Sequence, residues 1–272
     1  MAPTQLFIER KPRSPMKAQA LVTGASSGIG REFALHYARH GFHVCLVGRN
    51  EDELRTVAQE IEEVGATCDW VIADLSDTQG VAHVLETCGE PDVLIANAGV
   101  TLAGRAGSVS WNDLEKMSFL LGTGVAQLVD GIIPSMVRKK TGTVIVVSSI
   151  ASLIDMPNSA VYAASKSFAT RYASSLSREV RHAGVRVTAV CPGYVHTNLH
   201  SRAGLEHLEK KVPRWLWIEA STVVHAAVTG ARKGKPVVVP GFVYRVSLPF
   251  LNWSLAQRIW ARLTRRGRSR MA

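Results

Sequence analysis

The chain has 272 residues, a length that suits one domain with a full hydrophobic core rather than two domains. Its formal net charge of +10 could favour a nucleic-acid partner. Residues 1–17, however, contribute +3 of this charge, and residues 258–270 contribute +6. The body between these two segments is therefore nearly neutral. This distribution argues against a broad basic surface for nucleic acid on the body.

The first predicted elements are a short buried strand at residues 18–23 and a helix at residues 29–40. The turn between them contains Gly24, Gly28 and Gly30, which leave the backbone without side chains. Bare backbone amides and the positive end of a helix dipole suit a pyrophosphate group. The spacing GxxxGxG differs from the GxGxxG of many dinucleotide-binding folds, and tight turns also use glycine for other reasons. Between a strand and a helix, however, the turn favours a nucleotide site.

A second strand, at residues 43–47, ends before Gly48 and Arg49. Folds that select NAD usually place an acidic residue near this point to bind the ribose hydroxyls, whereas an arginine accommodates the additional phosphate of NADP. Arg49 could form charge-assisted hydrogen bonds to that phosphate, with Ser26 or Ser27 as hydroxyl partners. The alternative is that Arg49 is a solvated loop cation. The pattern predicts an NADP site.

A third group of residues suggests chemistry. Ser149 follows a predicted strand at residues 143–147, and Tyr162 and Lys166 lie four residues apart, so that in a helix they share one face. A phenol has a pKa of about 10, which a nearby positive charge lowers. A serine hydroxyl at the carboxyl end of a parallel strand points into the crevice where such sheets bind ligands. The three groups could converge on one carbonyl oxygen; the alternative is an ordinary amphipathic pair and a turn serine.

The alternation of strand and helix patterns predicts an α/β fold, a Rossmann-type doubly wound parallel sheet in a single domain. The apolar runs at residues 143–147 and 185–190 lack polar alternation, as in strands that are covered on both faces. A last strand is expected at residues 236–240.

Together these motifs resemble those of the short-chain dehydrogenase/reductase family over residues 18 to about 200. They occur in the family's order and spacing: TGASSGIG, ADLSD, ANAGV, the serine, tyrosine and lysine named above, and CPGYVHT. The resemblance implies that the cofactor is bound by Gly24, Ser26, Ser27, Gly28, Ile29, Gly30, Arg49, Asp74, Leu75, Asn97, Ala98, Gly99, Tyr162, Lys166, Pro192, Gly193, Val195 and Thr197.

The resemblance also implies individual roles for several of these residues. Asp74 and Leu75 would hold the adenine. Asn97 to Gly99 would line the adenine ribose and brace the central strand, and Thr197 would bind the nicotinamide carboxamide. Taken singly, Asp74 could be a helix cap, Asn97 a turn residue and Thr197 a loop hydroxyl.

The reaction that the resemblance implies is reduction of a carbonyl, or its reverse, with Ser149, Tyr162 and Lys166 as the catalytic residues. Ser149 would hydrogen-bond the substrate oxygen, Tyr162 would donate the proton, and NADPH would deliver a hydride. Lys166 would bind the nicotinamide ribose and lower the pKa of Tyr162. No metal is required.

One position departs from the family pattern. The family usually has a catalytic asparagine thirteen residues before a proline, and counting back from Pro134 gives Leu121. A leucine side chain forms no hydrogen bond, so the asparagine-held water that links Lys166 to solvent lacks its usual anchor. Asn112 lies nine residues earlier and is a poor substitute. This departure supports an alternative function, an NADP-binding regulatory or scaffold protein with weak or no turnover.

The substrate is expected to contact residues 195–217, which would form a substrate lid in this family. Trp215 and Trp217 could line an apolar pocket or could anchor packing. The segments VPRWLWI and VVVPGFVYR resemble a bacterial subgroup that includes long-chain 3-oxoacyl and mycolate-type reductases. The expected substrate is therefore a lipid-like ketone such as a 3-oxoacyl chain, in lipid metabolism, with a steroid or a small alicyclic alcohol as the alternative.

The expected organisation has a flexible N-terminal extension at residues 1–16, an NADP-binding domain at residues 17–248 and a basic amphipathic tail at residues 249–272. The tail could lie on an anionic membrane surface, or it could pack on the domain or on a second subunit. No uninterrupted apolar run is long enough to span a bilayer. The four cysteines are expected to be reduced and buried. We expect a cytoplasmic homo-oligomer, a dimer or tetramer, with peripheral membrane contact through the tail as an open alternative and with no nucleic-acid partner.

Overall fold

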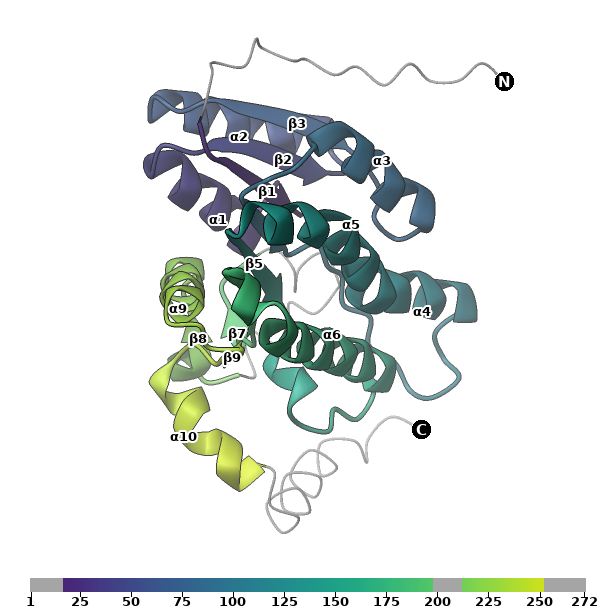
Figure 1. Ribbon diagram of the computed structural model, residues 1–272. Coiled ribbons are helices and arrows are strands. Elements are labelled where there is room, and N and C mark those ends of the chain that lie inside the picture. The colour runs from purple at the N-terminus through teal and green to yellow at the C-terminus, as the bar shows by residue number, and fades with distance from the viewer. Residues whose placement is uncertain (1–16, 198–211, 252–272) are drawn as a thin grey trace, which may run out of the picture.

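The computed structural model describes residues 17–197 and 212–251 (Figure 1). The expected N-terminal extension, the middle of the expected lid and residues 252–272 of the expected tail lie outside the described residues.

Seven parallel strands form one sheet in the order β3-β2-β1-β4-β5-β6-β9. They are β1 (Gln19–Thr23), β2 (His43–Gly48), β3 (Cys68–Ile72), β4 (Val93–Ala96), β5 (Gly142–Val147), β6 (Val185–Val190) and β9 (Val237–Val238). The chain builds outward from β1 to β3 and then returns to place β4 beside β1. The β1–β4 boundary is thus the switch point at which such sheets bind ligands, and the predicted doubly wound fold is confirmed.

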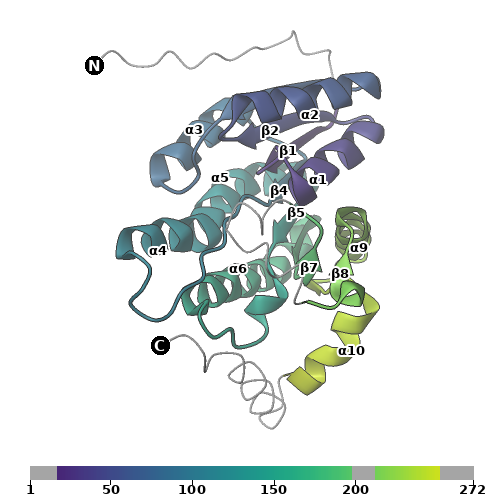
Figure 2. The ribbon, with the colours of Figure 1, turned by 180° about the vertical axis from the view of Figure 1, so that it is seen from behind.

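Helices cover both faces of this sheet (Figures 1 and 2). One face carries α1 (Gly28–Arg39), α2 (Glu51–Glu63) and α9 (Ala220–Arg232), and the other carries α3 (Thr78–Cys88), α5 (Gly124–Lys139) and α6 (Ala160–Glu179). Successive strand residues alternate between the two cores. In β5, for example, Val144 and Val146 pack on the α5 side, whereas Ile145 packs on the α1 side. The strands are therefore buried on both faces, as their apolar runs predicted.

Residues Trp111–Lys139 form one helical stretch that consists of α4 (Trp111–Ser118), the π-helical turn η1 (Phe119–Thr123) and α5. By length and composition it could cross a bilayer, since an 18-residue window within it has a mean hydropathy of 1.4, although scattered polar residues interrupt the apolar run. In the structure 61% of the apolar window is buried inside the domain. Burial of this kind is what a core helix of a globular domain shows.

The carboxyl-terminal part of the described chain adds a small sheet and a last helix. After β6, β7 (Tyr194–Val195) pairs with β8 (Trp217–Ile218), which follows the short 3₁₀ helix η4 (Arg214–Leu216). After β9, α10 (Phe242–Leu251) crosses the expected boundary between domain and tail. Two further 3₁₀ turns are η2 (Ile150–Ser152) and η3 (Arg181–Ala183).

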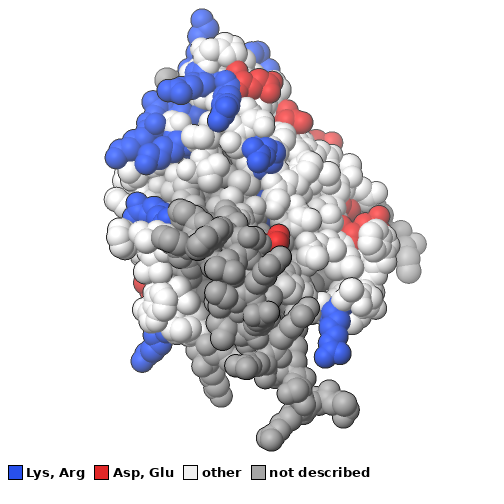
Figure 3. All heavy atoms as spheres, turned by 90° about the horizontal axis from the view of Figure 1, so that it is seen from below, with Lys and Arg blue, Asp and Glu red and all other residues white. Residues whose placement is uncertain are grey.

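The cysteines and the charges occupy different parts of the molecule. All four cysteines, Cys45, Cys68, Cys88 and Cys191, are buried and form no disulfide, as expected from the sequence. Seen from below, lysines and arginines gather along one side of the described surface, acidic residues lie mainly toward the other side, and much of the face is uncharged (Figure 3).

Candidate active site

The predicted catalytic residues lie at the carboxyl end of β5 and on α6. Ser149 opens η2, where its Oγ accepts a hydrogen bond from the Ala151 amide at 3.1 Å. Tyr162 lies in the first turn of α6, where the side chain of Ser149 is near enough to act on the pKa of its phenol. Lys166 follows one helical turn later and is only 6% exposed. The structure therefore brings the predicted serine and tyrosine together, with the lysine on the same helix.

The environment of Tyr162 keeps its phenol neutral. Burial raises the pKa of Tyr162 above its ordinary value, and the hydrogen bond with Ser149 opposes the shift. This direction is opposite to the expected lowering by Lys166. The Nζ atom of Lys166 instead donates to the carbonyl oxygen of Val147 at 2.8 Å. A phenol that retains its proton at neutral pH is suited to donate it.

Lys166 is a buried cation at the centre of a polar cluster. Burial lowers the pKa of its ammonium from 10.5 to about 8, and the thiol of Cys191 opposes this shift. A group with a pKa near 8 is mostly protonated at neutral pH. The hydroxyl of Ser148 donates to the main-chain oxygen of Lys166 at 3.0 Å and is hydrogen-bonded to Thr170 at 2.6 Å, which fixes this part of α6 to the end of β5.

Leu121 lies beside this lysine. It is fully buried in the π-helical turn η1, and a Cβ atom built on Gly99 would lie 3.1 Å from a Leu121 methyl and 3.8 Å from Lys166 Nζ. The leucine and the ammonium therefore flank the same glycine. Asn112 is exposed on α4, so it does not replace the missing amide. Hydrocarbon thus occupies the position at which the sequence resemblance expects an asparagine.

The glycine turn is held by residues at the ends of β1 and β4. Asn97 donates from Nδ2 to the carbonyl oxygens of Thr23 at 2.9 Å and Gly24 at 3.1 Å. The Thr23 hydroxyl in turn accepts from the amides of Asn97 at 2.9 Å and Ala98 at 3.0 Å. The predicted bracing of the central strand by Asn97 is therefore present. Sequence reasoning missed Thr23, whose only signal was a hydroxyl at the end of a buried strand next to the first glycine.

The shape of the turn fits a nucleotide pyrophosphate. Gly24 and Gly28 have φ angles of +62° and +55°, and a Cβ atom on Gly30 would lie 2.1 Å from the Gly24 oxygen. Side chains at these positions would strain or block the turn. Thr197 lies against the same turn, since its Cγ2 would be 2.8 Å from a Cβ atom on Gly28. The half-buried Ser26, Ser27 and Ile29 complete the turn and open α1, whose amino end faces this edge.

The remaining predicted cofactor residues also lie at carboxyl ends of strands. Arg49 is exposed directly after β2. Asp74 is exposed after β3, and its Oδ1 accepts from the Ser76 amide at 3.0 Å, while Leu75 is buried. Asp74 is not the cap of α3, because Asp77 takes that place.

The segment after β6 comes close to Ser149. The amide of Ile150 donates to the oxygen of Pro192 at 2.8 Å, which joins η2 to the start of that segment. Gly193 follows, and Val195 is buried in β7. The predicted residues follow the carboxyl ends of β1 to β6 and thus lie along one edge of the sheet.

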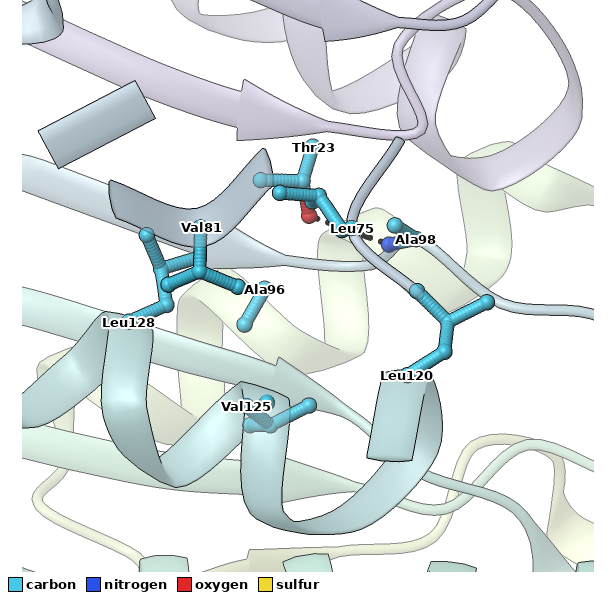
Figure 4. A pocket seen from close by; sticks show the side chains of 9 residues that line it. Thr23, Leu75, Val81, Ala96, Ala98, Leu120, Val125 and Leu128 are labelled. Carbon is cyan, nitrogen blue, oxygen red and sulfur yellow. Dashed lines mark hydrogen bonds between the residues drawn. The ribbon is translucent and has the colours of Figure 1, made fainter. Parts of the chain in front are cut away.

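Two hollows near this edge do not hold the catalytic residues. A cavity of about 10 Å³ lies below the turn, where apolar side chains from β4, η1 and α5 meet the hydroxyl of Thr23, which bonds Ala98 (Figure 4). This volume is at most that of a single water molecule. A larger groove of about 670 Å³ is lined by residues of η2, α6 and β9, among them Ser152, Ser167 and Phe168. Neither is lined by Ser149, Tyr162 or Lys166.

The two tryptophans near the expected lid differ. Trp217 is 8% exposed, stacks on His196 at 5.0 Å and donates from Nε1 to the Val212 oxygen at 3.4 Å, so it anchors packing. Trp215 is 65% exposed on η4. Within residues 17–197 and 212–251, no three His, Cys, Asp or Glu side chains converge to hold a metal ion.

Comparison with known proteins identifies the family. The short chain dehydrogenase family model matches residues 18–207. An uncharacterized oxidoreductase of Myxococcus xanthus is 35% identical over 184 residues, which cover 66% of this chain and 73% of that protein. A short-chain dehydrogenase from Sphingobium yanoikuyae in complex with NADPH superposes with a TM-score of 0.76 at 26% identity, covering 94% of this chain and 97% of that one. A putative NAD(P) dependent gluconate 5-dehydrogenase from Beutenbergia cavernae with bound NADP gives a TM-score of 0.73 at 31% identity, covering 83% and 96%.

With the family's motifs gathered at one edge of a doubly wound sheet, the chain belongs to the short-chain dehydrogenase/reductase family of NAD(P)-dependent oxidoreductases.

Proposed function

We propose that this chain is an NADP(H)-dependent oxidoreductase that reduces a carbonyl to a secondary alcohol or catalyses the reverse reaction. The observation that carries the proposal is the placement of Ser149 at the start of η2 and of Tyr162 in the first turn of α6, with Lys166 buried one helical turn further along that helix. These groups lie at the same edge of the sheet as the glycine turn.

Each catalytic residue has one task in this mechanism. Ser149 holds the substrate oxygen by a hydrogen bond, and Tyr162 donates its phenolic proton to that oxygen. NADPH, when bound, would supply the hydride for the carbonyl carbon. Lys166 would hold the ribose hydroxyls next to the nicotinamide, and its positive charge would stabilise the phenolate that Tyr162 becomes.

The preference for NADP over NAD rests on the end of β2. Arg49 is exposed there, directly after Gly48, and Asn50 caps α2, so the strand end itself carries an arginine and no carboxylate; the first acids are those of α2, which begins at Glu51. Ser26 and Ser27 are hydroxyl partners from the neighbouring turn. Two similar structures, from Sphingobium yanoikuyae and Beutenbergia cavernae, contain NADPH and NADP respectively.

The proposed substrate is a lipid-like ketone such as a 3-oxoacyl chain. The exposed indole of Trp215, with Phe242 at 73% exposure on α10, offers apolar surface in the part of the chain that follows the cofactor residues. A steroid or a small alicyclic alcohol is the alternative substrate class.

A second candidate function is NADP binding without turnover. The observation that favours it is that a Leu121 methyl and the Lys166 ammonium both lie against Gly99, because a leucine holds no water for proton exchange. This protein would retain the nucleotide site and act as a regulatory or scaffold component.

One experiment separates the two functions. NADPH binding and NADPH oxidation are measured with 3-oxoacyl, steroid and alicyclic ketones, for the unmodified chain, Tyr162→Phe and Tyr172→Phe. Tyr172 is the matched control, because its hydroxyl bonds Asp130 on α5 instead of Ser149. Turnover that is lost only in Tyr162→Phe supports the reductase, whereas NADPH binding without turnover of any ketone supports the alternative. A chain that neither binds nor oxidises NADPH would contradict both.

Association into a homo-oligomer and contact with a membrane are further proposals. Phe168 is 44% exposed on α6 and stacks parallel to Tyr172, which supports a contact between copies through α6. Light scattering of the purified chain tests this, and a monomer at all concentrations would contradict it.

Flotation with anionic liposomes, with and without residues 252–272, tests whether a cytoplasmic protein uses its basic tail at a membrane. Equal partitioning of the two forms would exclude that role.

A further inference from the structure

Tyr244 links two segments near the cofactor residues, although no sequence pattern gave it a role. It lies in the first turn of α10 and is 6% exposed. Its hydroxyl accepts a hydrogen bond from the amide of Tyr194 at 3.0 Å and donates one to the carbonyl oxygen of Leu216 at 2.5 Å. Tyr194 begins β7, and Leu216 directly precedes β8. One hydroxyl therefore joins the starts of the two paired strands.

The ring of Tyr244 also occupies the space beside Gly193. A Cβ atom on Gly193 would lie 2.0 Å from Cζ of the ring, closer than side-chain carbons approach. A glycine at position 193 is therefore needed for the ring to lie here. Burial raises the pKa of the Tyr244 phenol, so the hydroxyl keeps the proton that it donates to Leu216.

The clamped strand leads directly to the glycine turn. After β7, the amide of His196 donates to the oxygen of Ile218 at 3.1 Å, and its ring stacks on Trp217. The next residue is Thr197, which lies against Gly28 as described above. The small sheet formed by β7 and β8 therefore determines where Thr197 meets the turn. Tyr244 holds the two strands together where they begin.

We propose that Tyr244 is a positioning residue for the dinucleotide, which it affects by holding residues 193–197 in register against the glycine turn. This inference rests on the proposed function, since it takes the nucleotide to lie at that turn. It assigns to α10 a part in cofactor affinity, although Tyr244 does not itself touch the reacting atoms.

The test is Tyr244→Phe in the full-length chain, which removes the hydroxyl and keeps the ring. Two quantities are measured: amide hydrogen exchange over residues 193–197 and the Kd for NADPH by fluorescence titration. We expect faster exchange at Tyr194, whose amide loses its acceptor, and a Kd that rises roughly 3- to 10-fold, as the loss of one hydrogen-bonded link implies. The kcat at saturating NADPH should stay within about twofold of the original, because uniform binding is what is lost.

Two further variants sharpen this test. Tyr172→Phe removes a tyrosine hydroxyl that bonds α5, far from this segment in the chain, and should change neither quantity. Gly193→Ala displaces the Tyr244 ring and should raise the Kd as well. The double variant Gly193→Ala/Tyr244→Phe should add little to Gly193→Ala alone, since displacing the ring already breaks the hydrogen bonds of its hydroxyl.

Each contrary outcome has a defined meaning. Unchanged exchange at Tyr194 in Tyr244→Phe would overturn the clamp. Faster exchange with an NADPH Kd within twofold of the original would show a purely structural role and would overturn the positioning role. If the unmodified chain does not bind NADPH, the proposed function is contradicted, and so is the positioning role that rests on it. The exchange data would still decide whether Tyr244 clamps the two strands.

Discussion

Thr23 ends β1, and its hydroxyl is the central hydrogen-bonding group below the glycine turn. The residue is 1% exposed, and its Oγ1 donates to the Ile95 oxygen at 3.2 Å while it accepts from two amides, those of Asn97 and Ala98. Thr23→Val keeps the shape of the side chain but replaces the hydroxyl with a methyl group. Two amides then lose their acceptor in a part-buried site.

The size of the effect follows from those two amides. A donor left without a partner in a buried site costs about 1–3 kcal/mol, and these two amides are part-buried, which places each near the lower limit; the free energy of unfolding should therefore fall by about 2 kcal/mol. That is a large share of the ~5–15 kcal/mol of a typical domain. The Kd for NADPH should also rise, because Asn97 holds the Gly24 carbonyl of the turn.

The assay is urea unfolding of the original chain, Thr23→Val and Thr23→Ser, with circular dichroism and fluorescence as independent probes. Thr23→Ser is the matched control, since it keeps the hydroxyl and loses one buried methyl group, at a cost of about 1 kcal/mol. If Thr23→Val is as stable as Thr23→Ser, the hydroxyl does not hold the turn and the reasoning is wrong.

Three further predictions concern catalysis and cofactor choice. Leu121→Asn should raise kcat, on the order of tenfold, because an amide beside Lys166 can hold a water for proton exchange; Leu120→Asn in the same turn is the control, and an equal effect of both would contradict the relay. The kcat/KM should fall as pH rises through about 8, since Lys166, with a pKa of about 8, then loses the charge that stabilises the phenolate; a constant value up to pH 10 would count against this role. Arg49→Ser should raise the Kd for NADPH by roughly 10- to 100-fold and leave that for NADH unchanged. Arg55→Ser, which removes another exposed arginine, should change neither, and an equal loss for both nucleotides in Arg49→Ser would rule out phosphate recognition.

The sequence was sufficient for the sheet and for much of the candidate site, because both depend on local signals. Buried strands appear as apolar runs, and the glycines of the turn from Gly24 to Gly30 predict a close approach of backbone groups there. The spacing of Tyr162 and Lys166 places them on one face of α6 whatever the rest of the chain does. The order of the family's motifs along the chain then identified Ser149 as the catalytic serine expected from the resemblance.

Features that depend on distant segments could not be predicted. The pKa of Tyr162 is raised because the folded domain buries the phenol, and burial is not visible in a local pattern. Asp77 rather than Asp74 caps α3, a choice between two nearby acids that only the backbone decides. Tyr244 bonds Tyr194, which is 50 positions away in the chain, and Leu216, which is 28 positions away. No local sequence pattern predicts contacts between residues so far apart.

Transfer of a hydride from the nucleotide to a carbonyl is the central claim, and isotope transfer measures it most directly. The chain is incubated with NADPH that carries deuterium at the transferable C4 position and with the best ketone of the panel, and the alcohol is analysed by mass spectrometry. The proposed reaction predicts one deuterium on the carbinol carbon of the product, formed by the original chain and lost in Tyr162→Phe. An alcohol without deuterium, or equal formation by Tyr162→Phe, would contradict it.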